Sequence, residues 1–204
     1  MRRRIRRQGR SHEHPDRLGP RFASPEALAA GGGADVREAS TLSPGTALDI
    51  GCGEGADALW LAEHGWAVTA VDVSRVAVDR GRARAERLGL TVDRQVADVA
   101  QVEGRFDLVI AFCPVLHTDS GVWEHVLDRV APGGTLLFVH HLDVDRERAR
   151  AHGFDPDALV APADVPATVG AGWRIEVDEA VDREVIEGAG AHDHRDGIVR
   201  ARFL

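Results

Sequence analysis

Three glycines at alternate positions, directly after an apolar segment that contains one acidic residue, constrain this chain more than any other feature. Residues 47–50 are Ala-Leu-Asp-Ile, and Gly51, Gly53 and Gly55 follow before a helical pattern begins. Glycine tolerates positive φ and lacks a Cβ, so the backbone can turn sharply and lie against a ligand. The following helix would direct unpaired N–H groups and the positive end of its dipole toward that ligand. The run therefore predicts a ligand-binding turn between a buried strand and a helix.

Composition narrows the class of protein. The chain has 204 residues, of which 44% are hydrophobic, which is enough for one α/β domain with a full core. The formal net charge of -8 argues against general nucleic-acid binding, which usually needs a basic face. No apolar run approaches the ~18 residues of a membrane span. Cys52 and Cys113 supply neither a disulfide framework nor a metal-ligand spacing. We therefore expect a cytoplasmic protein without a membrane partner or a metal.

The beginning of the chain differs from the rest. Residues 1–10 are rich in Arg, and the segment through Gly33 shows no sustained hydrophobic period. No apolar stretch of a secretory signal follows the basic start. We expect residues 1–40 to form a poorly ordered, Arg-rich segment and residues 41–204 to form the domain.

Strand and helix patterns alternate from residue 46 onward. Apolar runs predict strands, and amphipathic runs with Ser74 as a cap and Gly65 and Gly89 as ends predict helices. The expected strands are 46–50, 67–71, 91–97, 106–112 and 135–139, and the expected helices are 56–63, 75–87 and 122–130. In the first helix, Leu59, Trp60 and Ala62 are expected to face the core. This alternation predicts right-handed crossovers and a doubly wound, mostly parallel sheet.

The end of the chain follows a different pattern. Residues 174–186 and 197–203 are rich in Val and Ile, and the connection between them is too short for a helical crossover. An antiparallel hairpin is the economical interpretation. The connection contains His192-Asp193-His194, with Asp196 close by, but histidines at alternate positions of an extended chain point to opposite faces. We interpret this group as a solvated loop rather than a metal site.

Acidic residues end three successive strands of the predicted sheet. Asp49, Asp72 and Asp98 occupy these places, and residues 113–117, His140, His141 and Asp143 occupy the corresponding ends of the later strands. Ligands of open α/β sheets bind beyond the carboxyl ends of the strands. Three carboxylates beside a glycine turn therefore indicate hydrogen-bond acceptors that converge on one ligand.

Two classes of ligand compete for this turn. Gly51-x-Gly53-x-x-Ala56 satisfies the dinucleotide fingerprint, and Asp72 follows about twenty residues later, as an acceptor for an NAD ribose would. A nicotinamide-dependent oxidoreductase is therefore an alternative. Against it, Asp49 directly precedes the turn and would repel a pyrophosphate. The same acid suits a ligand that carries a positive charge and an ammonium group, and the antiparallel end of the sheet departs from the dinucleotide pattern.

Asp49-x-Gly51-x-Gly53-x-Gly55 resembles motif I of the class I S-adenosylmethionine-dependent methyltransferases. The resemblance covers about residues 42–203 and includes the runs 71–74, 97–99, 106–109 and 132–134, in family order and spacing. Residues 49–55 together with 58–62 are particularly similar to the small bacterial tellurite-resistance and thiopurine-type methyltransferases. The family implies a Rossmann-like, seven-stranded sheet with an antiparallel final strand, here 197–203. It also implies N-terminal helices that cover the cofactor, where this chain has its irregular Arg-rich segment.

The resemblance assigns a role to each matching position around S-adenosylmethionine. The turn made by Gly51, Cys52, Gly53 and Gly55 would pass under the methionine and ribose. Asp49 would help to hold the amino-acid end of the cofactor.

The same resemblance assigns the remaining positions. Asp72 would accept both ribose hydroxyls, and Val73 would pack on the adenine. Asp98 would accept from the adenine amine beside the Val99 N–H, and Cys113 would border the sulfonium.

The expected reaction is in-line methyl transfer to a small molecule. Alignment of the reacting atoms supplies much of the rate, and a base is needed only for a protonated hydroxyl or amine. His117, in the loop after the fourth strand, is the candidate base. His140 and His141 face opposite sides of their strand, so at most one of them points into the pocket. A non-catalytic protein that binds the cofactor or only a partner protein is the third alternative.

Overall fold

A seven-stranded mixed sheet forms the centre of the molecule, in the strand order β3-β2-β1-β4-β5-β7-β6. The computed structural model describes residues 38–151, 153–182 and 195–204. The strands are β1 Thr46–Ile50, β2 Ala67–Asp72, β3 Asp93–Val96, β4 Phe106–Phe112, β5 Val130–His141, β6 Trp173–Asp182 and β7 Arg195–Phe203. Strands β1 to β5 pair in parallel, and β7 runs antiparallel to both β5 and β6. The predicted fold class and the antiparallel final strand are confirmed.

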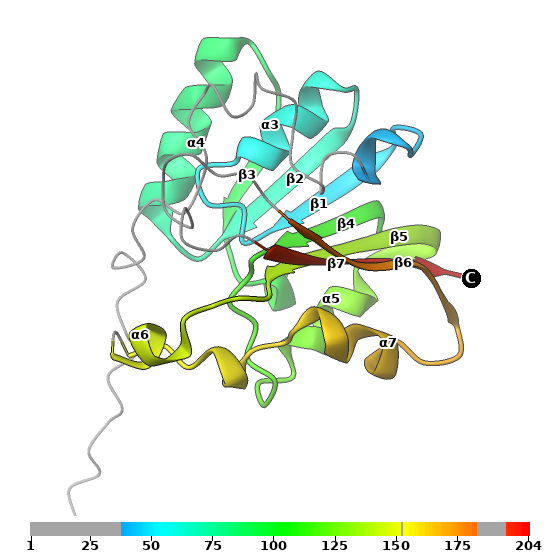
Figure 1. Ribbon diagram of the computed structural model, residues 1–204. Coiled ribbons are helices and arrows are strands. Elements are labelled where there is room, and N and C mark those ends of the chain that lie inside the picture. Colours follow the sequence, from blue (N-terminus) through cyan, green and yellow to red (C-terminus); the bar gives the residue numbers. More distant parts are fainter. Residues whose placement is uncertain (1–37, 152, 183–194) are drawn as a thin grey trace, which may run out of the picture.

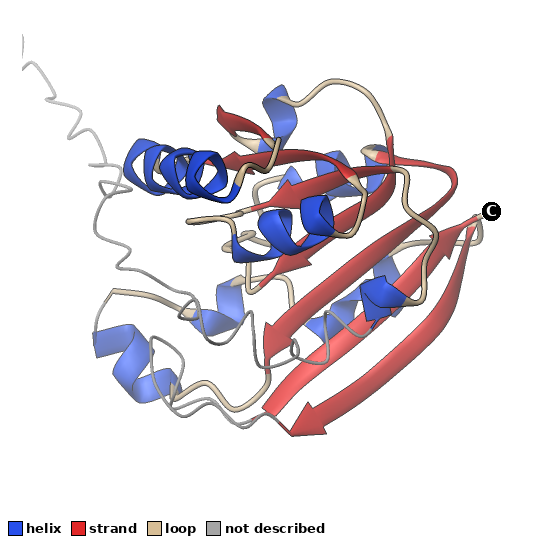
Figure 2. Ribbon diagram, turned by 90° about the horizontal axis from the view of Figure 1, so that it is seen from above, coloured by secondary structure: helices blue, strands red, loops and turns tan. Residues whose placement is uncertain are grey.

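Helices cover both faces of this sheet. The α-helices are α3 Ala56–Glu63, α4 Arg75–Leu88, α5 Val122–Asp128, α6 Arg146–Ala151 and α7 Val165–Thr168, and the short 3-10 helices are η2 Val99–Gln101, η3 Pro156–Ala158 and η4 Pro162–Asp164. Helices α3 and α4 lie on one face, and α5 and α7 lie on the other (Figure 1). The view from above shows β6 and β7 as a long antiparallel pair at one edge (Figure 2). The sheet is therefore doubly wound, as the sequence predicts.

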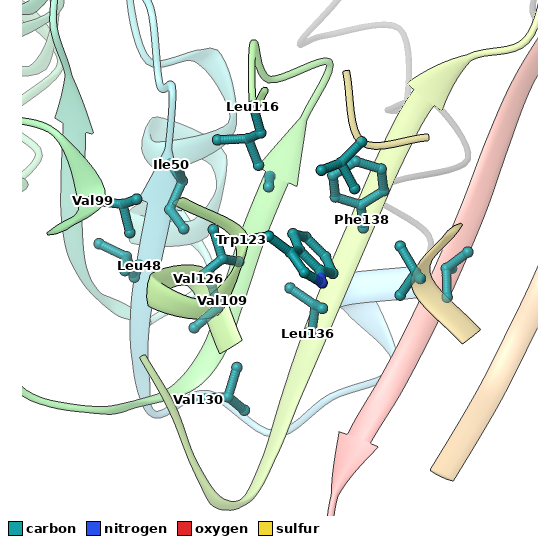
Figure 3. Close-up of a cluster of buried hydrophobic side chains, with 14 of the residues drawn as sticks. Leu48, Ile50, Val99, Val109, Leu116, Trp123, Val126, Val130, Leu136 and Phe138 are labelled. Atoms are coloured by element: carbon teal, nitrogen blue, oxygen red, sulfur yellow. The ribbon is translucent and has the colours of Figure 1, made fainter. Parts of the chain in front are cut away.

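Two apolar clusters fill the space between the sheet and these two helical layers. In β4, Val109 and Ala111 face one cluster, while Leu108, Ile110 and Phe112 face the other, because strand side chains alternate. The first cluster packs under α5 around Trp123 and Phe138, whose rings meet edge to face at 5.5 Å (Figure 3). At its end near the strand termini this cluster includes Ile50, Val99 and Leu116, which become important for the site below.

Local signals for helix ends are reliable in this chain. Ser74 caps α4, and its Oγ accepts from the N–H of Ala77 at 3.3 Å. Gly89 closes the same helix with φ 67°. Helix α5 is shorter than predicted and ends at Asp128, because β5 begins at Val130. Two helical ends are thus as expected, and one is displaced by the strand that follows.

Three other predictions are corrected by tertiary packing. Strand β5 begins before Pro132-Gly133-Gly134, because a register shift against β4 accommodates these residues inside the strand. Strand β3 spans only 93–96, shorter than the predicted 91–97. Helix α3 buries Leu59 as predicted, together with Ala58 and Leu61. Trp60 and Ala62 also pack against the core cluster but are only partly buried, and the Trp60 ring stacks on His64 with centroids 3.8 Å apart.

Some predictions fall on residues outside the described part of the chain. These are most of the N-terminal segment 1–40 and the group His192-Asp193-His194, and the division at residue 40 stays a prediction. None of the helices within residues 38–151, 153–182 and 195–204 has the length and apolar character needed to cross a bilayer.

Candidate functional site

A cavity of about 610 Å³ opens at the carboxyl ends of β1 to β4. Its wall combines the glycine turn after β1, the acidic ends of β2 and β3, the loop after β4 and one side of α5. The lining residues are Ile50, Gly51, Gly53, Glu54, Val71, Asp72, Val73, Ser74, Val76, Ala77, Arg80, Ala97, Asp98, Val99, Ala100, Cys113, Pro114, Val115, Leu116, His117, Ser120, Val122 and His125. The segments that the sequence placed around one ligand therefore meet in space.

The glycine turn adopts a backbone that glycine permits and other residues resist. Gly51, Gly53 and Gly55 have φ of 70°, 52° and 77°. The N–H groups of Gly51 and Cys52 both donate to the Val71 carbonyl, at 2.9 and 3.0 Å. These bonds tie the turn to the end of β2 and leave its glycine surface against the cavity.

Asp72 joins the two strand ends that form the middle of the site. Its Oδ2 accepts from the N–H of Gly53 and its Oδ1 from the N–H of Ser74, both at 2.8 Å. A carboxylate oxygen can accept two hydrogen bonds, so each oxygen of Asp72 retains acceptor capacity toward the cavity that this residue lines. The carboxylate is therefore fixed in place and able to bind a pair of hydroxyl groups.

An apolar platform flanks this carboxylate. Val73 and Val76 are 51% and 44% exposed, although both are large apolar side chains on the cavity wall. Buried Val99 lies on the same wall, and Asp98 caps η2 by accepting from the N–H of Ala100 at 2.9 Å. Exposed apolar side chains in a concave site beside fixed polar groups are typical of a small-ligand pocket.

Behind the turn lies a buried arginine that the sequence analysis did not predict. Arg94 of β3 is 6% exposed, and its Nη2 donates to the Gly55 carbonyl at 3.3 Å. A Cβ on Gly55 or on Gly81 of α4 would come within 2.1 or 2.4 Å of this guanidinium. The two glycines therefore leave the space that the Arg94 guanidinium needs in order to reach and support the turn. A glycine in the middle of an amphipathic helix was the available signal.

Asp49 shares this buried region. The side chain is 2% exposed, and its Oδ2 has no hydrogen-bond partner among the described residues. Burial raises the pKa of Asp49 to about 7, while Arg94 opposes the shift and Asp72 adds to it. Asp49 is thus protonated in the folded protein over a range in which it is ionised in the unfolded chain.

This shift predicts a pH dependence of stability. Because the folded pKa of about 7 lies above the ordinary 3.8, the contribution of Asp49 is complete below about pH 4 and is lost as pH rises to about 7. Wild-type protein should therefore lose free energy of unfolding between about pH 4 and about pH 7 relative to Asp49→Asn. Urea unfolding of both proteins across this range measures the difference. Parallel curves would contradict the assignment.

Two histidines and a cysteine line the part of the cavity that is formed by the loop after β4 and by α5. His117 lines it and is exposed, and the carbonyl oxygen of His117 accepts from Ser120 Oγ at 2.6 Å. His125 lines the cavity from α5 and was not anticipated; its spacing of three residues from Val122, which also lines the cavity, is the helical signal. Cys113 is partly buried at the end of β4 and lies on the same wall. Neither His140 nor His141 lines the cavity.

The predicted site residues divide into two groups. Gly51, Gly53, Asp72, Val73, Asp98, Val99, Cys113 and His117 all line the cavity. Asp49, Cys52 and Gly55 are buried behind its wall. Contact of this second group with a cofactor stays a prediction, as do the individual roles of the first group.

Comparison with known proteins agrees with this geometry. Residues 47–134 match the family described as a methyltransferase domain. Ribosomal RNA small subunit methyltransferase C of Alcanivorax borkumensis is 40% identical over 72 residues, which are 35% of this chain and 22% of that protein. This chain spans less than half the length of the curated relatives that head the comparison.

Solved structures match over most of the chain. A protein described for the conversion of a disulfide bond into a thioacetal group during echinomycin biosynthesis is 26% identical, with TM-score 0.63, and the match covers 83% of this chain and 80% of that one. TehB from Haemophilus influenzae is 16% identical, with TM-score 0.60, over 86% of this chain and 63% of that one. The similarity to TehB shows a shared fold. At the level of the fold, it confirms the predicted resemblance to the small bacterial tellurite-resistance and thiopurine-type methyltransferases.

Proposed function

We propose, from the class I S-adenosylmethionine-dependent methyltransferase domain that this chain contains, that the protein transfers a methyl group from S-adenosylmethionine to a small molecule in the cytoplasm. One observation carries the proposal. A fixed carboxylate, a glycine turn and exposed valines surround a single cavity of about 610 Å³. This combination fits a nucleoside that has a sugar diol, a planar base and a cationic amino-acid tail.

The residues present fit the donor at each of its parts. Asp72 would accept the ribose hydroxyls while its bonds to Gly53 and Ser74 keep it in position. Val73 and Val99 would enclose the adenine, and Asp98 would accept from its amine. The glycine turn would lie under the methionine, where the absence of a Cβ allows close approach.

The donor supplies a sulfonium methyl that is already activated for transfer. The chain therefore has to align an acceptor rather than provide strong chemical assistance, and alignment within ~3–3.5 Å can supply much of the rate. His117 and His125 both line the cavity, and either can take a proton from a hydroxyl or amine acceptor. A thiolate acceptor needs no such base.

The net charge of the chain and one similar solved structure support a small acceptor. The net charge of -8 opposes binding of a nucleic-acid backbone, although one similar protein is a ribosomal RNA methyltransferase. The echinomycin protein, whose match covers most of both chains, modifies sulfur atoms in a biosynthetic reaction. Nicotinamide dinucleotides are disfavoured because the antiparallel β5-β7-β6 end of the sheet departs from the dinucleotide-binding pattern.

A transfer assay tests the function. The protein is incubated with S-adenosylmethionine and a panel of thiols, phenols, amines and metalloid anions, with ribosomal RNA as a separate arm, and S-adenosylhomocysteine is quantified by mass spectrometry. We expect turnover with at least one small acceptor and none with RNA. Turnover only with RNA would overturn the choice of acceptor, and calorimetric binding of NAD without binding of S-adenosylhomocysteine would overturn the activity.

A further inference from the structure

Three titratable side chains form a hydrogen-bonded chain at the edge of the cavity. Cys113 Sγ lies 3.3 Å from His141 Nε2, and His141 Nδ1 lies 2.7 Å from Asp196 Oδ1. Nothing in methyl transfer from the sulfonium requires a histidine and a carboxylate behind this cysteine. A thiol, an imidazole that contacts it and an acid that orients the imidazole constitute the arrangement of an activated nucleophile.

The order of the strands in the sheet brings Cys113, His141 and Asp196 together. His141 and Asp196 are directly opposite each other in the antiparallel pairing of β5 with β7. Cys113 directly follows β4, and its N–H donates to the Val139 carbonyl of β5 at 2.7 Å. Three adjacent strand ends thus supply one residue each. The side chains of His141 and Asp196 are 16% and 14% exposed, so the pair is shielded while Cys113 borders the cavity.

The backbone of Cys113 adds an independent observation. Among the described residues, Cys113 is the only non-glycine residue with a positive φ, at 48°. Such a conformation is costly for a residue with a Cβ and is concentrated at functional sites. Here it occurs at the residue that both lines the cavity and contacts His141 through its sulfur.

The charge on His141 agrees with this geometry. Burial lowers its pKa, but the hydrogen bonds to Asp196 and to the Cys113 sulfur outweigh burial and raise the pKa to about 10. An imidazolium that donates to sulfur stabilises a thiolate. Cys52 is the contrasting case, because burial, Asp49 and Asp72 all raise the pKa of its thiol.

We propose that Cys113 is a nucleophile toward soft carbon electrophiles that enter the cavity, with His141 as its acid–base partner and Asp196 as the positioning residue. The chemical class is an α,β-unsaturated carbonyl compound. An adduct on Cys113 would occupy part of the cavity wall and block the methyl donor; this last consequence alone rests on the proposed function.

The addition balances without an oxidant or a reductant. The thiol proton resides on His141, and the sulfur electron pair forms a bond to the β-carbon of the electrophile. The π pair of the double bond moves toward the carbonyl and gives an enolate. His141 then returns the proton to the α-carbon, so the product is a thioether and a neutral imidazole that still contacts Asp196.

Labelling with N-ethylmaleimide, followed by mass spectrometry of the peptides, tests this inference on the full chain. At neutral pH, Cys113 should react about tenfold faster than glutathione, while Cys52 stays unlabelled in the folded protein. His141→Gln should slow Cys113 about tenfold, and Asp196→Asn about threefold. His140→Gln is the matched control and should leave the rate unchanged. A rate equal to that of glutathione, or an unchanged rate in His141→Gln with Cys52 still protected, overturns the proposal.

Labelling of Cys52 reports whether a variant is folded, because this cysteine is buried in the folded protein. If His141→Gln exposes Cys52 to the reagent, the decision passes to Asp196→Asn, in which Cys113 should react about threefold more slowly than in wild-type protein while Cys52 stays protected. An unchanged rate at Cys113 in Asp196→Asn overturns the proposal.

A second arm separates this site from the proposed function. If S-adenosylhomocysteine binds the unlabelled protein, the labelled protein should fail to bind it, and unchanged binding refutes the blocking consequence. If the unlabelled protein does not bind it, methyl transfer fails, while the labelling rates still decide the nature of Cys113.

Discussion

Asp72→Ala should weaken binding of S-adenosylhomocysteine by at least about 100-fold in calorimetric titration. The variant removes the acceptor of two ribose hydroxyls, and hydrogen bonds to a charged group contribute about 1.5–3 kcal/mol each. It also removes the acceptor of the Gly53 and Ser74 N–H groups, so the turn loses a support.

Asp79→Ala is the matched control for this experiment. Asp79 is an exposed carboxylate on α4 that pairs with Arg82 at 2.7 Å, away from the cavity wall. Exposed pairs of this kind contribute at most about 1 kcal/mol to stability, so cofactor affinity should be unchanged. Equal affinities of the two variants would place the ribose elsewhere and remove Asp72 from the site.

Gly55→Ala should be the most destabilising single substitution in the turn. The added Cβ would lie 2.1 Å from the buried Arg94 guanidinium, and φ of 77° is unfavourable for alanine. The left-handed conformation costs about 1–2 kcal/mol, and displacing Arg94 from the Gly55 carbonyl adds about 1–3 kcal/mol. Urea unfolding should show a loss of about 2–5 kcal/mol.

Gly89→Ala separates the two causes of that loss. Gly89 also has a positive φ, 67°, but no atom lies within 4 Å of the position of its Cβ. The control should lose only about 1–2 kcal/mol, from backbone conformation. If both variants lose the same free energy, Arg94 does not support the turn.

Residues whose roles depend on local chemistry were predictable from the sequence. The glycines Gly51, Gly53 and Gly55 predict a turn with positive φ, because only glycine adopts that backbone conformation without strain. Asp72 follows an apolar strand directly, so its place at the sheet edge follows from the strand pattern. The lining of the cavity by these segments confirms that the strand ends converge.

Residues whose roles depend on distant partners were not predictable. Arg94 sits in a short strand with polar neighbours and would ordinarily be taken as exposed, since its burial depends on Gly55 and Gly81 in other elements. His141 meets Asp196 only through the register of two antiparallel strands separated by 55 positions in the chain. Pro132-Gly133-Gly134 resembles a strand breaker, and only the pairing with β4 shows that β5 continues through it.

A crystal structure of the complex with S-adenosylhomocysteine would show whether the cofactor lies on the glycine turn. We expect both ribose hydroxyls within hydrogen-bond distance of the Asp72 carboxylate, the adenine between Val73 and Val99, and the homocysteine over the glycine turn. Electron density for the ligand outside this cavity, or with its ribose away from Asp72, would exclude this mode of binding.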